Sequence, residues 1–334
     1  MNGRDIKNNE TVCAVVVTYN RKNLLLECLE AIKKQTRPVD AIYLIDNAST
    51  DGTPELLKEK GYISELPPIE LSEPWEKEFE IKNYTDGNVI KFHYVRMNEN
   101  TGGAGGFYEG LKRAYEKGYD WFWLMDDDCE PIYNGLANQI AYRNIALCIH
   151  PSKMYADGKI FIWEGLLDER TGYVFHYKGK EDFRETKSWT NVNFGCFEGM
   201  LIHRSVVEKI GFPKKEFFLY GDDTYYGYLA SKFTQNIYIR EFCIIKKKYS
   251  TNNLQNSLNV YLFSRNIIGF LSRKIAKNKN WNLLFTIFLL LLFSWRYIIR
   301  FKFKLLYWLW KGYLDGRCER WGKEKILVKK FSKI

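Results

Sequence analysis

The sequence has few of the residues that build metal centres and disulfide frameworks. Its four histidines, His93, His150, His176 and His203, show no spacing typical of metal ligands. Its seven cysteines are an odd number and include no Cys-x-x-Cys pair. This pattern excludes a disulfide framework and a cysteine zinc site, and it is consistent with reduced thiols.

Targeting, repeat and nucleotide-binding signatures are also missing. The first ten residues lack the apolar core of a signal peptide, so we expect the chain to begin in the cytoplasm. No period of about 20 to 50 residues is visible, which excludes a repeat array. The glycine-rich stretch over residues 98–106 has neither the Gly-Lys-Ser/Thr of a P-loop nor the Gly-x-Gly-x-x-Gly spacing of a dinucleotide site.

Positive charge gathers at one end of the chain. The net charge is +10, and residues 273–334 hold 16 Lys and Arg against 3 Asp and Glu, so the part before them is slightly acidic. The same tail contains a largely apolar stretch, of which the uninterrupted part, Ile287 to Phe293, is shorter than the about 20 residues that span a bilayer. Basic residues then alternate with aromatic ones, namely Arg296, Arg300, Lys302 and Lys304.

This tail favours a helix that lies in the membrane interface against anionic lipid. The alternatives are a buried core helix, a contact in a homo-oligomer, and a nucleic-acid-binding surface.

Alternating apolar strands and amphipathic helices fill most of residues 11–250. Val12 to Thr18 and residues 41–45 have the composition of buried strands, and a helix is expected between them from Lys22 to about Gln35. Residues 64–87 are rich in Pro, Glu and Lys without a clear period, which we interpret as a surface excursion. The order of elements predicts an α/β fold with a mostly parallel sheet and helices on both faces.

Three consecutive aspartates, Asp126, Asp127 and Asp128, follow the apolar run from Trp121 to Met125. Such a run places them at the carboxyl edge of a buried strand, where α/β sheets hold ligands. Crowded carboxylates need a cation, and hard oxygen ligands suit Mg²⁺ or Mn²⁺ beside substrate phosphates. A solvated acidic turn is the alternative for so short a pattern.

Six motifs occur in a defined order: Val17 to Arg21, Asp46 to Gly52, Asn100 to Gly106, Asp126 to Asp128, Gly199 to Arg204 and Phe217 to Asp223. In order and spacing the chain resembles the inverting family-2 glycosyltransferases, and it looks most like the bacterial galactofuranosyl- and rhamnosyltransferases. The resemblance implies a GT-A fold, which is Rossmann-like, over residues 11–250. It divides this domain into a nucleotide-sugar half, 11–130, and an acceptor half, 131–250. A polar tail, 1–10, would precede the domain, and a basic, aromatic helical region, 251–334, would follow it.

The resemblance assigns chemical roles to four aspartates. Asp126 and Asp128 would hold Mn²⁺ or Mg²⁺, which neutralises the departing nucleoside diphosphate. Asp223 would be the general base that takes the proton from the attacking acceptor hydroxyl, and Asp222 would bind acceptor hydroxyls. Helix N-capping is the alternative for this pair.

Further residues are candidates for substrate contacts. Glycines permit close backbone approach to phosphate at a helix N-terminus, although they also let a helix pack on a sheet. Aromatic faces suit sugar rings, although most aromatic side chains are core residues. The donor candidates are Thr18, Asn20, Asp46, Asn100, Gly102, Gly103 and Asp127, and the acceptor candidates are Trp163, Glu164, Glu198 and Asp222.

One residue that the family commonly has is absent. Relatives place a His, a third metal ligand, on the strand after the helix that carries the base, and residues 237–249 contain none. We expect Lys247 or Lys248 at that position, where an ammonium would neutralise phosphate charge directly. Cys243 or water as the remaining metal ligand is the alternative.

Together these features predict an inverting glycosyltransferase at the cytoplasmic face of the cell membrane. By resemblance the donor is UDP-galactofuranose, with dTDP-rhamnose as the alternative. The acceptor would be a surface polysaccharide or a glycan linked to polyprenyl diphosphate. Alternatives from other classes are a nucleotidyltransferase-like protein that binds nucleic acid and a catalytically silent glycan-binding module. The slightly acidic catalytic part argues against nucleic acid, and intact Asp126, Asp128 and Asp223 argue against the silent module.

Overall fold

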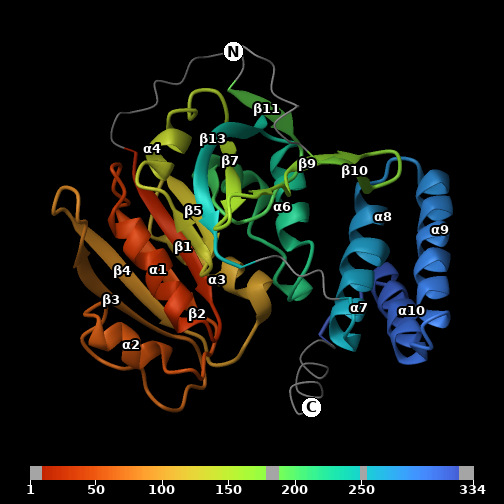
Figure 1. The fold of residues 1–334 in the computed structure, drawn as a ribbon, viewed down its shortest axis with the longest axis horizontal. Coiled ribbons are helices and arrows are strands. Elements are labelled where there is room, and N and C mark those ends of the chain that lie inside the picture. Colours follow the sequence, from red (N-terminus) through yellow and green to blue (C-terminus); the bar gives the residue numbers. More distant parts are fainter. Residues whose placement is uncertain (1–9, 178–187, 249–253, 323–334) are drawn as a thin grey trace.

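The computed structural model describes residues 10–177, 188–248 and 254–322, which form a large sheet covered by helices and, beside it, a group of further helices (Figure 1). Most of the predicted polar tail, residues 1–9, lies outside the described residues. So do the last twelve residues of the predicted C-terminal region, 323–334.

Thirteen strands are described, eleven of them in one sheet. They are β1 (Val12–Thr18), β2 (Ala41–Asp46), β3 (Trp75–Lys82), β4 (Val89–Arg96), β5 (Trp121–Asp126), β6 (Cys129–Pro131), β7 (Cys148–Tyr155), β8 (Ile160–Phe161), β9 (Gly165–Asp168), β10 (Tyr173–Tyr177), β11 (Trp189–Val192), β12 (Met200–His203) and β13 (Asn236–Lys246). The order across the sheet is β11-β13-β7-β12-β5-β1-β2-β4-β3, with β6 beside β13 and β8 beside β7. Its centre, from β5 through β1 and β2 to β4, is parallel, whereas β12 runs antiparallel between β5 and β7. β9 and β10 form a separate hairpin.

Helices cover both faces of this sheet, as predicted. The described helices are α1 (Lys22–Lys33), α2 (Thr53–Glu59), α3 (Gly102–Glu116), α4 (Gly135–Ile140), α5 (Arg204–Ile210), η2 (Lys215–Phe217), α6 (Asp222–Ala230), α7 (Ser257–Phe263), the π-helix η3 (Ser264–Leu271), α8 (Ser272–Ile275), α9 (Lys279–Ile298) and α10 (Phe303–Arg317). Alternate residues of β1 belong to different hydrophobic clusters because successive side chains of a strand point to opposite faces. On one face, Val12, Ala14 and Val16 pack with α1, α2 and α4. On the other face, the residues between them pack with α3, α5 and α6.

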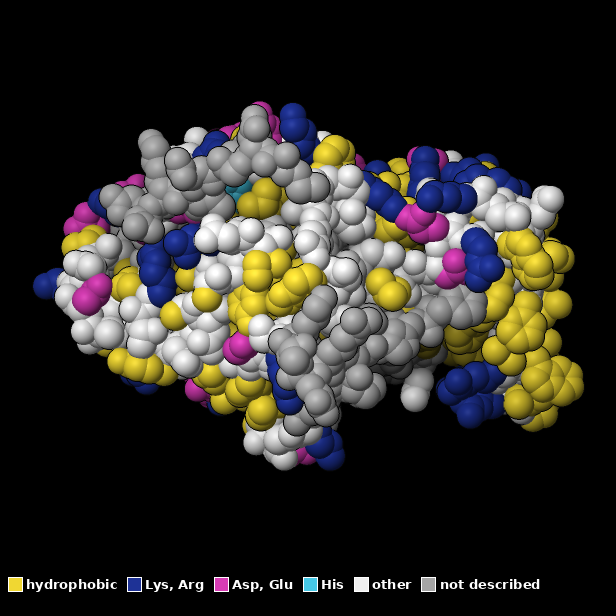
Figure 2. Space-filling view, turned by 90° about the horizontal axis from the view of Figure 1, so that it is seen from above, with side chains coloured by type: hydrophobic (Ala, Val, Ile, Leu, Met, Phe, Trp, Pro, Cys, Tyr) yellow, Lys and Arg dark blue, Asp and Glu magenta, His cyan; other side chains and the backbone are white. Residues whose placement is uncertain are grey.

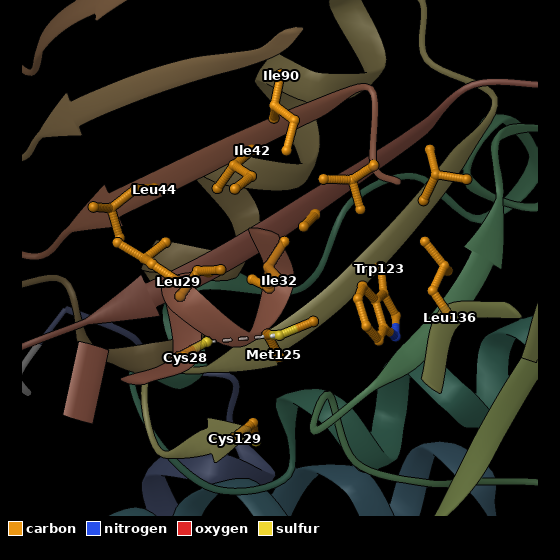
Figure 3. Close-up of a cluster of buried hydrophobic side chains, with 14 of the residues drawn as sticks. Cys28, Leu29, Ile32, Ile42, Leu44, Ile90, Trp123, Met125, Cys129 and Leu136 are labelled. Atoms are coloured by element: carbon orange, nitrogen blue, oxygen red, sulfur yellow. Dashed lines mark hydrogen bonds between the residues drawn. The ribbon is translucent and has the colours of Figure 1, made fainter. Parts of the chain in front are cut away.

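The core beneath α1 fixes the two central strands that lead to the site. Leu29 and Ile32 of α1 are buried in one cluster with Ile42 of β2 and Trp123 of β5, and the thiol of Cys28 lies 3.8 Å from the Met125 sulfur (Figure 3). Fully burying one such side chain stabilises the fold by about 1.5–3 kcal/mol. The carboxyl ends of β1 and β5 are therefore held side by side.

The predicted surface excursion contains a strand. β3 pairs antiparallel with β4 along its whole length, from Trp75 opposite Arg96 to Lys82 opposite Val89, at the edge of the sheet. The interpretation of residues 64–87 was wrong at this point because an edge strand needs little apolar surface. Charged cross-strand pairs replace it, such as Lys91 with Glu80 at 2.6 Å.

The C-terminal helices pack on each other and on the sheet domain. Glycines bring α10 into contact with η3, since a Cβ on Gly316 would lie 2.0 Å from the carbonyl oxygen of Arg265. The β9–β10 hairpin reaches α9, where the Tyr173 hydroxyl lies 2.8 Å from the hydroxyl of Thr286. Part of the predicted C-terminal region is thus joined to the sheet domain by specific contacts.

Candidate functional site

A cavity of about 300 Å³ opens at the carboxyl edge of β5. Asp126 ends β5, Glu198 lies just before β12, and Asp222 and Asp223 begin α6; all of these carboxylates line the cavity. The structure therefore brings one metal candidate, the proposed base and two acceptor candidates to one place. Apolar and aromatic side chains from the β9–β10 hairpin, the loops before β9 and β12, and η3 form most of the other walls, among them Trp163, Leu167, Tyr173, Phe194, Ile267 and Leu271.

The cavity carboxylates are crowded and poorly compensated. Burial raises the pKa of Asp126 well above its usual value, and Asp128, Glu198 and Asp127 raise it further against the effect of Lys246. Burial also raises the pKa of Asp222, to about 7, and it raises the pKa of Asp223 well above the usual value, with a further rise from Asp222. Such shifts indicate a site that favours a proton or another cation.

The start of α6 is held by side chains of η3. Backbone φ is positive at Phe218 (64°), Tyr220 (68°) and Gly221 (84°), so two non-glycine residues adopt a sparsely populated conformation. The buried Asn266 amide donates to three carbonyls of this loop, with donor–acceptor distances of 2.9, 2.7 and 3.0 Å to residues 217, 219 and 220. The Arg265 guanidinium donates to the carbonyl of residue 217 at 3.0 Å. These bonds hold the strained loop before the two aspartates.

The capping alternative describes only a part of the contacts of this pair. The N-cap residue of α6 is Gly221, so neither aspartate occupies that position. The Asp223 carboxylate does accept the backbone N–H of Thr224 at 2.5 Å and its hydroxyl at 3.1 Å. These bonds orient one oxygen of Asp223 while its carboxyl group still lines the cavity.

The second aspartate of the triplet faces β1 and α1. The Thr18 hydroxyl donates to Asp127 at 2.7 Å, and the Arg21 guanidinium donates to Asp127 at 3.1 Å and to Asp128 at 3.5 Å. Two donor candidates, Thr18 and Asp127, are thus in direct contact. Arg21 was in a recognised motif but had no predicted role. Its place between β1 and α1, at the sheet edge where the acidic triplet follows β5, is the signal that could have indicated one.

Lys246 contacts the triplet, which corrects the expectation for Lys247 or Lys248. The Lys246 ammonium lies 3.1 Å from Asp128 and 2.5 Å from Glu198. Burial alone would lower the pKa of Lys246, but Glu198 and its other acidic neighbours raise it above the usual value, so the group is charged. Lys247 points away and pairs with Glu27 and Glu130. Lys248 is exposed.

Of the two predicted metal ligands, Asp126 is open to the cavity and Asp128 is already paired, and the metal-binding role of both stays a prediction. Asp126 lines the cavity and makes no side-chain hydrogen bond or ion pair among the described residues. Both oxygens of Asp128 already face positive groups, Lys246 and Arg21. Within residues 10–177, 188–248 and 254–322, no three His, Cys, Asp or Glu side chains are grouped so as to hold a metal ion.

The remaining donor candidates lie around the ends of β1 and β2. Asp46 is fully buried, and its carboxylate accepts from Tyr94 at 2.7 Å and from Arg96 at 2.6 Å. Asn20 is exposed and accepts the N–H of Thr50 at 2.6 Å. These polar groups organise the loops in this structure. Their contacts with a nucleotide-sugar donor stay predictions.

The glycine-rich stretch forms the first turns of α3 instead of a separate loop. Gly102 has φ of 72°, and a Cβ there would lie 2.0 Å from the Phe218 carbonyl oxygen, so the stretch packs closely on the loop before α6. The side chain of Asn100 accepts the N–H of Gly102 at 2.8 Å. Gly103 lines the cavity.

Of the acceptor candidates, Glu164 is set apart. It is fully buried and pairs with the equally buried Lys153, and it does not line the cavity. Cys196 donates to both Glu164, at 3.5 Å, and Glu198, at 3.6 Å. Glu164 therefore contacts the same thiol as Glu198 but lies outside the cavity, whereas Trp163, Glu198 and Asp222 line it.

Comparison with known proteins was made by sequence and by structure. The family model described as Glycosyl transferase family 2 matches residues 13–66 and 78–211. Galactofuranosyltransferase GlfT1 of Mycolicibacterium smegmatis is 26% identical over 226 residues, which are 64% of this chain and 63% of that protein. GlfT1 of Mycobacterium tuberculosis is 26% identical over 223 residues, 64% of this chain and 62% of that protein. The chain thus spans less than two thirds of the length of these curated relatives.

Solved structures show a shared fold at low sequence identity. GalNAc-T7 with UDP, GalNAc and Mn²⁺ aligns with a TM-score of 0.52 and 14% identity, over 78% of this chain and 48% of that one. Residues 1–349 of S. aureus TarS with UDP-GlcNAc align with a TM-score of 0.51 and 13% identity, over 80% of this chain and 67% of that one. Both likenesses support the predicted GT-A architecture.

Proposed function

The chain belongs to glycosyl transferase family 2, and from this premise we propose that it transfers a sugar from a nucleotide donor with inversion, in the cavity between β5 and α6. One observation carries the proposal. The proposed base, Asp223, and Asp222 face Asp126 across a single cavity, with aromatic and apolar walls around them. The division into a donor half before about residue 130 and an acceptor half after it agrees with this placement.

In the proposed reaction Asp223 removes the proton from the acceptor hydroxyl as its oxygen attacks the sugar carbon. Its raised pKa makes Asp223 a stronger base than an ordinary aspartate. Asp222 and Glu198 would orient acceptor hydroxyls from the same side. The aromatic ring of Trp163 lies at the cavity wall, where a sugar ring would stack.

Thr18, Asp127 and the loops around Asn20, Asp46 and Asn100 are the proposed donor side. A nucleoside diphosphate carries charge that the carboxylates would repel, so a cation is needed there. A bound Mn²⁺ or Mg²⁺ would supply Lewis-acid neutralisation of the diphosphate. Asp126 is the residue best placed to hold such an ion, whereas the predicted share of Asp128 conflicts with its pairing to Lys246.

We propose UDP-galactofuranose as the donor and a lipid-linked glycan or growing surface polysaccharide as the acceptor. The curated relatives named galactofuranosyltransferases support the donor. dTDP-rhamnose remains the alternative donor.

An apolar face on α9 supports a lipid-linked acceptor. We propose that this face binds the cytoplasmic side of the membrane. Among the described helices, α9 has the length and composition that would suit a membrane span. Only 28% of its apolar stretch is buried inside the protein. Trp281, Leu284, Phe288, Leu291 and Trp295 are all exposed at helical spacing. Figure 2 shows hydrophobic side chains gathered at this end of the molecule, with Lys and Arg beside them.

A panel of nucleotide sugars tests the donor. We expect purified full-length protein to bind and turn over UDP-galactofuranose at least ~10-fold better than UDP-galactopyranose or dTDP-rhamnose, a ratio that needs about 1.4 kcal/mol of discrimination. A preference for dTDP-rhamnose would replace the proposed donor. Binding of RNA with a steep salt dependence, without any nucleotide-sugar turnover, would contradict the proposal as a whole.

A further inference from the structure

Lys246 is fixed by the strand pairing around it. Lys246 is the last residue of β13. It lies opposite Cys129 of β6, the residue that directly follows the acidic triplet in the chain. The backbone N–H of the next residue, Lys247, donates to the Asp128 carbonyl at 2.8 Å. These pairings hold the base of the Lys246 side chain beside the Asp128 carboxylate.

The ammonium of Lys246 is enclosed by acidic groups. It lies between Asp128 and Glu198, and its side chain is 5% exposed, with 4% for Asp128 and 10% for Glu198. Arg21 approaches the other oxygen of Asp128 at 3.5 Å. A metal ion bound to Asp128 would therefore have to lie against a positive group on either oxygen.

We infer that Lys246 is a resident cation of the donor site, occupying the position at Asp128 that a divalent ion would need. It acts as a positioning residue, because it holds the side chains of Asp128 and Glu198 in place and leaves Asp126 as the metal-binding group. The inference rests on the proposed function only in assigning the site to a nucleotide donor. It predicts weak binding of divalent ions to the free protein, and stronger binding when the ammonium is removed.

Titration of the full-length protein with Mn²⁺ alone tests this arrangement, followed by calorimetry or by the electron paramagnetic resonance of free Mn²⁺. Lys246→His should bind Mn²⁺ at least ~10-fold more tightly than the parent, because an imidazole joins Asp126 and the released Asp128 as a third ligand. Lys246→Arg should leave the Mn²⁺ affinity at the parent value. Lys247→Gln is the matched control, since it removes a neighbouring positive charge that pairs only with Glu27 and Glu130 among the described residues.

Two variants of the otherwise unchanged protein decide the question even if Lys246→His does not fold. Asp126→Asn should abolish Mn²⁺ binding to the free protein, whereas Asp128→Asn should change the affinity by less than about threefold. Equal losses in both variants, or a parent that binds Mn²⁺ as tightly as Lys246→His, would overturn the inference. Because no sugar donor is used, a negative result in the nucleotide-sugar panel would leave this outcome unaffected.

Discussion

Asp222 and Asp223 are neighbours in the chain, yet they meet the cavity in different environments. Asp223 is oriented by two bonds from Thr224, whereas Asp222 is 8% exposed and lies near Asp126. Burial is the main cause of the raised pKa in both. Both carboxyls therefore lose their protons at higher pH than a free aspartate does.

The rate of transfer should depend on pH in the direction set by this pair. A general base must be deprotonated, and its pKa is raised, so kcat/KM should increase with pH through the ionisation and then level off. Because burial raises the pKa of Asp223 well above the usual value, the rise should fall at higher pH than for an ordinary aspartate, with a loss of up to tenfold per unit below it. Donor affinity measured over the same range is the control. A profile that is flat from about pH 5 to 9 would show that neither aspartate is the base.

The structure brings together those predicted site residues whose motifs lie at the end or start of an element. Asp126, Glu198, Asp222 and Asp223 reach one cavity because β5 ends there, the antiparallel β12 begins beside that end, and α6 begins with the last two. The expectation for the lysine was displaced by one residue. Successive side chains of a strand alternate between faces, and composition cannot show which of three consecutive lysines faces the aspartates. The pairing of β13 with β6 decides it.

Among the elements, η3 connects the C-terminal helices with the catalytic loop. The sequence predicted helices in this region, but nothing in it indicated a π-helix, which often marks a functional site. The amide of Asn266 and the guanidinium of Arg265 hold the loop over residues 216–220. Strained backbone of this kind persists only when its surroundings determine it.

Replacing Asn266 should therefore affect catalysis through the loop. Asn266→Ala removes one donor from the carbonyls of residues 217, 219 and 220. The first keeps its bond from Arg265, and the other two lose this partner, at a cost of about 1–3 kcal/mol for a buried group left unsatisfied. We expect kcat to fall at least ~10-fold while the donor KM changes little. Asn280→Ala, at an exposed position of α9, is the control. If Asn266→Ala lowers only the melting temperature and the folded fraction keeps the parent kcat, the loop does not depend on this residue.

At the scale of the whole molecule, the excess of positive charge and the exposed apolar face of α9 lie in the same C-terminal region. The contacts of α10 with η3 make deletion of residues 273–334 a poor test, because it would uncover the helix that holds the catalytic loop. The sequence could predict the basic, apolar character of the tail. It could not predict these contacts, since they depend on close approach at Gly312 and Gly316.

Substitution of basic residues tests membrane binding without removing a helix. Arg296, Arg300 and Lys302 line a cavity of about 320 Å³ near the end of α9. Replacing all three with Gln should weaken binding to anionic vesicles by about 1 kcal/mol per charge, roughly 100-fold in total, and less at high salt. The matched control replaces three exposed lysines of the catalytic part, Lys58, Lys60 and Lys82. An equal loss in both variants, or a parent that binds no vesicles, would contradict membrane attachment through α9.

The central claim is that the cavity between β5 and α6 performs glycosyl transfer with Asp223 as its base. The most direct measurement compares full-length parent and Asp223→Asn for donor affinity and for transfer at saturating donor. Asparagine keeps the shape of the side chain but cannot take the proton. The account predicts that transfer falls at least ~100-fold while the donor Kd stays within about threefold. Transfer near the parent rate, or a parallel loss of donor binding and of folding stability, would contradict it.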